Sequence, residues 1–238
     1  MSQAHVRPEV EQARPGGPVP ARRALAGFLR THRIQLAGLG ATVLVFGIFI
    51  LASPQVFLRP SIYVAFLTTA PFFGIMALGL TLVLVARQID LSFPSTMALA
   101  AFVGATVFQA TGSLPLSLLA TLGVGAGVGA VNGLLITRVG IPSIIATLGM
   151  MFAARGAAHV LSQGLSVPLT AAARDPLRQL FVGQVLGGVP AQSLWFLAIG
   201  VGLWLLLFRH RFGDAVLFIG DNEDAARMMG VPVDRVKT

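Results

Sequence analysis

The apolar part of this chain holds few side chains that could take part in chemistry. Between Ile34 and Phe208 the only acidic residues are Asp90 and Asp175, and the whole chain has no cysteine. Without thiols, a disulfide framework and a thiolate metal site are both excluded. Four histidines are scattered along the sequence without the spacing of a metal motif: His5, His32, His159 and His210. Because no His, Asp and Glu residues cluster, we expect neither an enzyme nor a bound metal or cofactor.

Asp90 is the acidic residue that needs an explanation. It lies in the segment 87–92 (Arg-Gln-Ile-Asp-Leu-Ser), between two apolar runs. A carboxylate deep in a bilayer costs a few kcal/mol unless it is paired or hydrated. Two interpretations stay open. The carboxylate either accepts hydrogen bonds from backbone amides at the start of the next helix, opposing the helix dipole, or it binds a proton or cation whose gradient drives transport.

Four more polar residues in this part of the chain are candidates for a translocation path or for structural hydrogen bonds. Arg155 and His159 are four residues apart and therefore share one helix face. They either extend toward the outer membrane surface or form a polar wall. Ser92 and Asn132 either line a path or bond to another helix.

Composition places these residues in a membrane protein. The 238 residues are 55% hydrophobic and 11% charged, with a mean hydropathy of +0.81, whereas soluble domains carry about 25% charged residues. A bilayer-spanning helix needs about 20 apolar residues. Six runs reach about that length. The fourth begins at the turn 112–115 and ends at 137, and the other five are 34–52, 62–86, 94–111, 143–161 and 191–208. We predict an all-α, polytopic membrane helix bundle over 34–208. A basic tail (1–33) precedes it, a long connection (162–190) interrupts it, and a polar segment (209–238) follows.

The basic residues predict the orientation of these spans. With the N-terminus in the cytoplasm, 13 of the 17 Lys and Arg residues lie inside, and four lie outside: Arg59, Arg155, Arg174 and Arg178. Such asymmetry is typical of membrane proteins. It also explains the formal charge of +8 without a nucleic-acid partner.

Glycines in the fourth span predict close helix packing. Gly123, Gly125, Gly127, Gly129 and Gly133 lie at spacings that let two helix backbones approach. Packing inside one subunit, a dimer seam and a moving contact are the alternatives.

The segment 213–231 predicts a short helix just inside the membrane. Asp221 or Asn222 is a suitable N-cap, and the neighbouring residues Ala225 and Ala226 are strong helix formers. A helix of about two turns is too short to be stable alone in water, so we expect it to dock on something.

Side chains of this helix indicate a protein partner. Glu223 precedes Arg227 by the four residues that favour an ion pair, and Gly230 fits a helix stop. Met228 and Met229 are adaptable contact residues. A solvated loop is the alternative.

Residues 220–231 carry a family resemblance. This segment resembles the coupling loop of permease subunits from ribose-type sugar ABC importers. The matching residues are Gly-Asp-Asn-Glu, then Ala-Ala-Arg, then Gly-Val. The segments 76–84, 89–92 and 145–156 agree and follow in the family's order. Together they cover most of 62–238.

The resemblance implies a function and partners. The coupling loop would contact an ATPase subunit through Gly220, Asp221, Asn222, Glu223, Ala225, Ala226, Arg227 and Gly230. It further implies a second permease subunit (a homo- or heterodimer), a periplasmic sugar-binding protein and a bacterial inner-membrane location. ATP and Mg would be bound by the partner ATPase, because the only lysine, Lys237, does not form a P-loop. A small sugar or polyol would be the solute, and an ion-coupled secondary transporter using Asp90 is the alternative.

The chain departs from the family pattern in two places. Arg87 and Gln88 stand where the family usually has two glycines, and Phe93-Pro94 follow Ser92. Family members also have about ten spans, so the six present here resemble an N-terminal portion.

Overall fold

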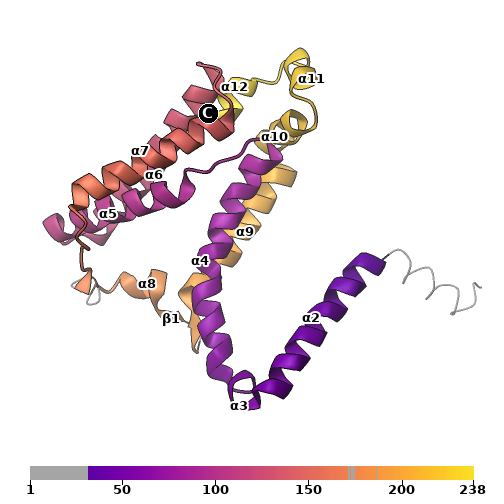
Figure 1. The fold of residues 1–238 in the computed structure, drawn as a ribbon, viewed down its shortest axis with the longest axis vertical. Helices are drawn as coiled ribbons and strands as arrows, with labels where there is room; N and C mark the ends of the chain where they lie inside the picture. The colour runs from indigo at the N-terminus through magenta and orange to yellow at the C-terminus, as the bar shows by residue number, and fades with distance from the viewer. Residues whose placement is uncertain (1–31, 171, 173–174, 186) are drawn as a thin grey trace, which may run out of the picture. The chain divides into compact units, whose positions relative to one another are not determined.

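The computed structural model describes residues 32–238 except 171, 173–174 and 186, and the described chain is almost entirely helical (Figure 1). Apart from His32 and Arg33, the predicted basic tail (1–33) lies outside the described residues, as does Arg174. The chain divides into two compact units, Met1–Ile62 and Tyr63–Thr238.

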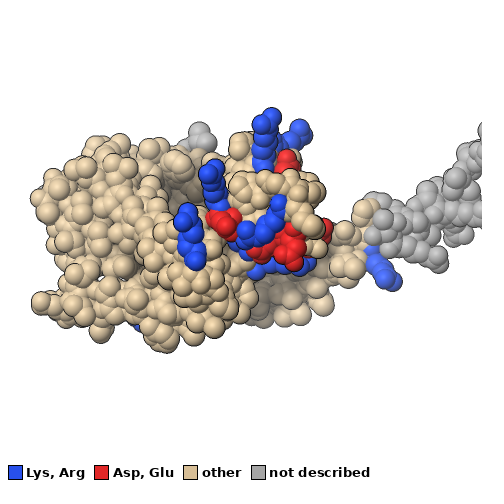
Figure 2. Space-filling view, turned by 90° about the horizontal axis from the view of Figure 1, so that it is seen from above, with Lys and Arg blue, Asp and Glu red and all other residues tan. Residues whose placement is uncertain are grey.

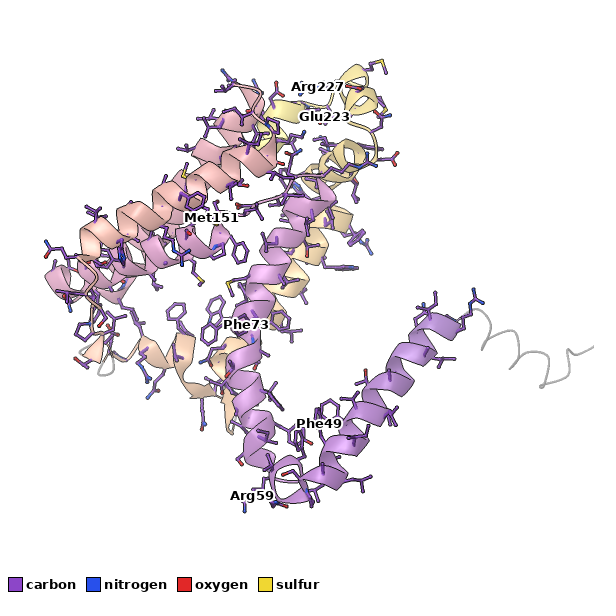
Figure 3. The ribbon with its side chains drawn as sticks, viewed as in Figure 1. Phe49, Arg59, Phe73, Met151, Glu223 and Arg227 are labelled. Carbon is purple, nitrogen blue, oxygen red and sulfur yellow. The ribbon has the colours of Figure 1, made fainter. Side chains whose placement is uncertain are left out.

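In the part of the first unit that the structure describes, a long helix is followed by a short one. Helix α2 (Arg33–Ala52) is followed after Ser53 by α3 (Pro54–Phe57). Proline is well suited to the first position of a helix, where its missing N–H has no intrahelical partner. The ring of Phe57 stacks on that of Phe49, with 5.1 Å between the centroids; Phe49 is labelled in Figure 3. This contact closes the turn between the two helices.

Five further long helices follow: α4 (Pro60–Val85), α5 (Phe93–Thr111), α6 (Leu114–Thr137), α7 (Ser143–Ser162) and α9 (Ala191–Arg209). Together with α2 they are the six helices of the described chain that are long and apolar enough to cross a membrane. Each begins and ends within two residues of a predicted span. The prediction of an all-α polytopic bundle is therefore confirmed.

Local sequence explains the sharp turn between α5 and α6. Gly112 follows α5 with φ +66°, a left-handed conformation that glycine adopts without strain. Ser113 then caps α6, because its Oγ accepts from the N–H of Leu116 at 3.4 Å. A two-residue link of this kind places the two helices side by side and antiparallel.

The second unit has two helix groups. Helices α5, α6 and α7 pack together, and α9 lies along α4 (Figure 1). A buried bond from Ser117 Oγ to the carbonyl of Gly104, 2.8 Å long, joins α6 to α5. Ser193 Oγ of α9 donates to the carbonyl of Leu67 in α4 at 2.6 Å.

The connection between α7 and α9 is more ordered than predicted. It contains α8 (Arg178–Val182) and a hairpin of β1 (Gln184–Val185) and β2 (Val189–Pro190), whereas the sequence predicted only a long connection there. Trp195 of α9 holds it, because its indole N–H donates to the carbonyl of Leu180 at 2.9 Å and its ring stacks on Phe181. These contacts between α9 and α8 order the connection, and the local sequence pattern of the connection does not reveal them.

The C-terminal segment also holds more helix than predicted. The expected short helix is α11 (Glu223–Met228), but α10 (Arg211–Asp221) and α12 (Val233–Lys237) flank it. Three buried residues, one from each helix, explain the difference: Ile219, Ala226 and Val233 form one small hydrophobic core. Helices this short become stable by packing on one another.

Within the described chain, most of the glycine run does not pack against another helix, so of its predicted roles the packing inside one subunit is found at one position only. A Cβ atom added at Gly123, Gly125, Gly127 or Gly129 would meet nothing within 4 Å. Only at Gly133 would it meet another segment, at the backbone of Thr238. The spacing of these glycines therefore permits a close contact that this chain makes at one position.

Candidate polar site and coupling segment

The link between α4 and α5 (86–92) turns at Ala86 and Arg87 and then continues without helix to Ser92, held against the start of α7. The Ile89 N–H donates to Ser143 Oγ at 3.3 Å, and the Leu91 N–H donates to Thr147 Oγ1 at 3.1 Å. Ile89 and Leu91 lie outside any helix and have no intrahelical acceptors, so side chains of α7 satisfy their backbone donors. Thr147 is only 2% exposed. Two of the segments that carry the family resemblance thus contact each other.

Asp90, Ser92 and Asn132 form one hydrogen-bonded cluster. Asp90 Oδ1 accepts from the Ser92 backbone N–H at 2.7 Å and from Ser92 Oγ at 2.6 Å. Asn132 Nδ2 of α6 donates to Ser92 Oγ at 2.9 Å across 40 residues of sequence. Ser92 is 1% exposed and Asn132 is 6% exposed. The fold therefore brings together three of the predicted polar residues, here called the Asp90 cluster.

The order of donors in this cluster is fixed by its chemistry. An ionised carboxylate only accepts hydrogen bonds, so the Ser92 hydroxyl proton is directed to Asp90. The serine oxygen must then accept from Asn132, which places the amide NH₂ group toward Ser92 and the amide oxygen on the other side. This geometry matches the first interpretation of Asp90, a carboxylate that accepts a backbone amide just before α5. The bonds to it are charge-assisted and strong.

A cavity of about 430 Å³ lies between α4, α5 and α6 and contacts the Asp90 cluster. Its walls are mainly apolar, with Ile75 and Leu80 from α4, and glycines of α6 leave room within it. A second cavity, of about 250 Å³, also borders the cluster and is lined in addition by Val216 of α10 and Lys237 of α12. Asp90 and Asn132 line both cavities. The cluster therefore borders both a space among the membrane helices and a space beside the C-terminal segment.

Thr96 lines the larger cavity and was not among the predicted residues. Its Oγ1 atom is buried and has no hydrogen-bond partner in the described chain, and the same holds for Asn132 Oδ1. Sequence alone gave no signal for Thr96, because a threonine inside an apolar helix is unremarkable by type and spacing.

Arg155 and His159 lie apart from the Asp90 cluster. Both side chains are exposed, and they border a separate cavity of about 530 Å³ with Phe102 of α5. They share one face of α7, as their spacing predicted. Exposed positions near the end of α7 fit the interpretation in which the two side chains extend toward the membrane surface.

The start of α11 has the predicted cap. Asn222 Oδ1 accepts from the Ala225 N–H at 3.0 Å, so Asn222 rather than Asp221 is the capping residue. Glu223 and Asp224 follow in the first turn, where negative charge opposes the helix dipole. Gly230 follows the helix with φ +82°, as the predicted stop requires.

A network of four charges frames α11. Arg227 donates to Glu223 at 3.1 Å and to Asp234 of α12 at 2.7 Å, and Lys237 donates to Glu223 at 2.5 Å. The hydrogen bond from Lys237 contributes most to lowering the pKa of Glu223 below its ordinary value. The hydrogen bond from Arg227 likewise lowers the pKa of Asp234. Both carboxylates thus stay ionised at neutral pH and hold α11 against α12.

The C-terminal segment is fixed to the bundle by a close backbone approach. A Cβ atom on Gly220 of α10 would overlap the carbonyl oxygen of Val85 at the end of α4. Val216 of α10 is buried in a cluster with Ala86 and Leu207, which adds hydrophobic contact at the same place. Gly220, predicted as a coupling residue, thus packs closely on α4 within the chain.

The outer side of α11 is left exposed. Met228 is 84% exposed and Met229 is 62% exposed, whereas Ala226 on the inner side is fully buried. Figure 3 labels Glu223 and Arg227 on this part of the chain. Figure 2 looks onto this end of the second unit, where charged residues gather in one area surrounded by uncharged surface. A folded, charged frame with two protruding methionines is a suitable contact surface for another protein.

Comparison with known proteins agrees with this architecture. The family described as branched-chain amino acid transport system / permease component matches residues 62–238. The L-arabinose ABC transporter permease protein of Azospirillum brasilense is 33% identical over 239 residues, which cover 100% of this chain and 68% of that protein. The autoinducer 2 import system permease protein LsrC of Enterobacter sp. (strain 638) is 32% identical, with coverages of 85% and 58%.

The ribose import permease protein of Escherichia coli (strain K12) is 34% identical over 166 residues, which cover 69% of this chain and 51% of that protein. The chain thus spans between half and about two thirds of the length of these relatives. No solved structure is significantly similar to it. The family match covers the site and the coupling segment together, and the chain therefore belongs to this family of membrane-spanning permease components of ABC importers.

Proposed function

We propose that this chain forms part of the transmembrane path of an ATP-driven importer for a small sugar or polyol. All three relatives named above are permease proteins of import systems or ABC transporters. Two of them are named for L-arabinose and ribose. The observation that carries the proposal is the position of the exposed α11 surface. It lies on a segment fixed to α4, next to a cavity that borders the Asp90 cluster. A partner that moves α11 would therefore act on the helices around the path.

The proposal includes three partners, in keeping with the relatives named above. An ATPase subunit binds ATP and Mg and docks on α11, since this chain's only lysine, Lys237, follows Val236 and does not form a P-loop motif. A second permease subunit, identical or related, completes the path, and a periplasmic binding protein delivers the solute. The ion-coupled alternative is not favoured, because Asp90 is already held by Ser92.

Docking of the ATPase is expected to depend on the two exposed methionines. Replacing Met228 and Met229 together with alanine removes apolar contact area without touching the buried core. Interface side chains of this kind contribute about 1–2 kcal/mol each, so ATPase recovery should fall roughly tenfold or more. The measurement is a gentle-detergent pull-down of the tagged chain from native membranes, with partners quantified by mass spectrometry. Leu165→Ala, at a 70% exposed position after α7, is the control and should leave recovery unchanged. Equal recovery from the methionine variant would exclude α11 as the docking surface.

The N-terminus and α11 are proposed to face the cytoplasm of a bacterial inner membrane. The link 86–92, Ile136 near the end of α6 and the C-terminal segment line one cavity and so share one end of the second unit. Gln109 near the end of α5 donates to Pro168 in the connection between α7 and α9 at 3.1 Å. The chain has no cysteine, so single cysteines report sidedness cleanly. A membrane-impermeant maleimide should label Leu165→Cys in spheroplasts and label Met229→Cys only after permeabilisation. The reverse pattern would invert the topology.

A further inference from the structure

We propose that Thr96 and Asn132 form a hydrogen-bonding site for hydroxyl groups of an uncharged solute in the cavity between α4, α5 and α6. The inference rests on the proposed function and names the part of the path that contacts the solute. It begins from two atoms, Thr96 Oγ1 and Asn132 Oδ1, which are buried without a partner in the described chain and whose residues line this one cavity. Buried polar atoms normally have partners, and exceptions mark functional positions or bound molecules.

The free hydroxyl of Thr96 is unusual within this fold. Eight other helical threonines, including Thr106 and Thr121, donate to the carbonyl four residues earlier. That local bond is the ordinary way for a threonine to satisfy its hydroxyl in an apolar helix. Thr96 makes no such bond. Its hydroxyl is therefore available to donate to, or accept from, a molecule in the cavity.

The free atom of Asn132 is an acceptor. Its Nδ2 donates to Ser92 Oγ, whose own proton is directed to Asp90, so the amide cannot turn over without breaking the Asp90 cluster. The oxygen of a side chain that is 6% exposed is thus held in place. This amide oxygen can accept a hydrogen bond from an O–H or N–H group of a bound molecule. The site accordingly offers one fixed acceptor, Asn132 Oδ1 of α6, and one hydroxyl, that of Thr96 in α5.

The charges of the cavity select the class of solute. Among the described residues that line it, Asp90 is the only charged one, and neither Lys nor Arg is present. A phosphorylated sugar or an amino acid carboxylate would find no cation to pair with and would meet the negative charge of Asp90. Apart from Ser92 and Thr121, whose hydroxyls are already bonded, the remaining walls are apolar. Hydroxyl groups combined with C–H faces fit such walls, and the volume lies in the range of small-molecule sites, so a neutral sugar or polyol matches best.

Uptake by the complete importer in cells tests the site with a matched pair of variants. Thr96→Val and Thr121→Val remove the same hydroxyl from the same cavity, but Thr121 already bonds to the carbonyl of Ser117 at 2.9 Å. Radiolabelled L-arabinose, ribose and fructose are the probes, with their monodeoxy analogues. For a transported sugar, Thr96→Val should lower the saturating uptake rate about fivefold, the effect of one hydrogen bond, and Thr121→Val less than twofold. One monodeoxy analogue should be carried equally by wild type and Thr96→Val.

Equal losses for both valine variants, or the same loss for every analogue, would overturn the site and assign Thr96 a structural role. If wild type carries none of the three sugars and recovers no ATPase, the proposed function fails. The cavity is then tested by Thr96→Cys alone. A small cationic thiosulfonate should modify this cysteine faster than an anionic one of similar size, because Asp90 lines the same space. No modification by either reagent, or no preference between them, would overturn the inference.

Discussion

Gly220→Ala is expected to uncouple the C-terminal segment from the membrane helices and to lower uptake by the importer at least tenfold. The added Cβ atom would overlap the backbone carbonyl oxygen of Val85, which cannot rotate away as a side chain would. Helix α10 must then shift away from α4. Overpacking of this kind costs about 1–3 kcal/mol or more, and it acts on the contact that transmits movement of α11 to the bundle.

Helix propensity alone would predict that Gly220→Ala stabilises α10 instead of displacing it. Alanine is favoured over glycine in a helix by about 1 kcal/mol, and Gly220 lies inside α10. The matched control is Gly202→Ala in α9, where the added atom would meet nothing within 4 Å. We expect Gly202→Ala to be neutral or slightly stabilising. Hydrogen exchange of the amides in 213–221 should rise in Gly220→Ala only, alongside the loss of uptake. Unchanged exchange and uptake would show that α10 does not need this close approach.

Local features of the fold were predictable from the sequence because their causes are local. Apolar runs of bilayer length set the six spans, and turn residues such as Gly112 and Ser113 set their ends. The cap at Asn222, the Glu223–Arg227 pair and the stop at Gly230 all depend on residues within a few positions of one another.

Contacts between distant segments were not predictable in the same way. The bond between Asn132 and Ser92 joins residues 40 positions apart, and the overlap at Gly220 depends on where α4 ends in space. Thr96 was missed because what distinguishes it is a bond that it fails to make. The glycine run shows a related limit, since its spacing permits close packing but does not say whether the partner helix belongs to the same chain.

Asp90 is expected to tolerate asparagine far better than alanine. In Asp90→Asn the side chain keeps the oxygen that accepts from both Ser92 donors. The bonds lose their charge assistance, which is worth about 1 kcal/mol, so uptake should fall about fivefold or less. In Asp90→Ala both donors lose their acceptor, and Ser92 is 1% exposed. Leaving such groups unsatisfied costs about 1–3 kcal/mol, so uptake should fall roughly 10- to 100-fold.

The two variants separate the structural role of Asp90 from ion coupling. A carboxylate that carried a proton or cation would lose its function equally in both variants, because neither can ionise. Uptake would then also collapse when the ion gradient is dissipated with ATP still present. If Asp90 instead anchors Ser92 and, through it, Asn132, uptake should be fastest in wild type, slower in Asp90→Asn and slowest in Asp90→Ala. Dissipating the ion gradient should then have no effect on uptake. Asn132 would lose its fixed orientation in Asp90→Ala because the Ser92 hydroxyl is free to turn. The same variant should therefore also weaken the sugar selectivity ascribed to the cavity, which Asp90→Asn should retain.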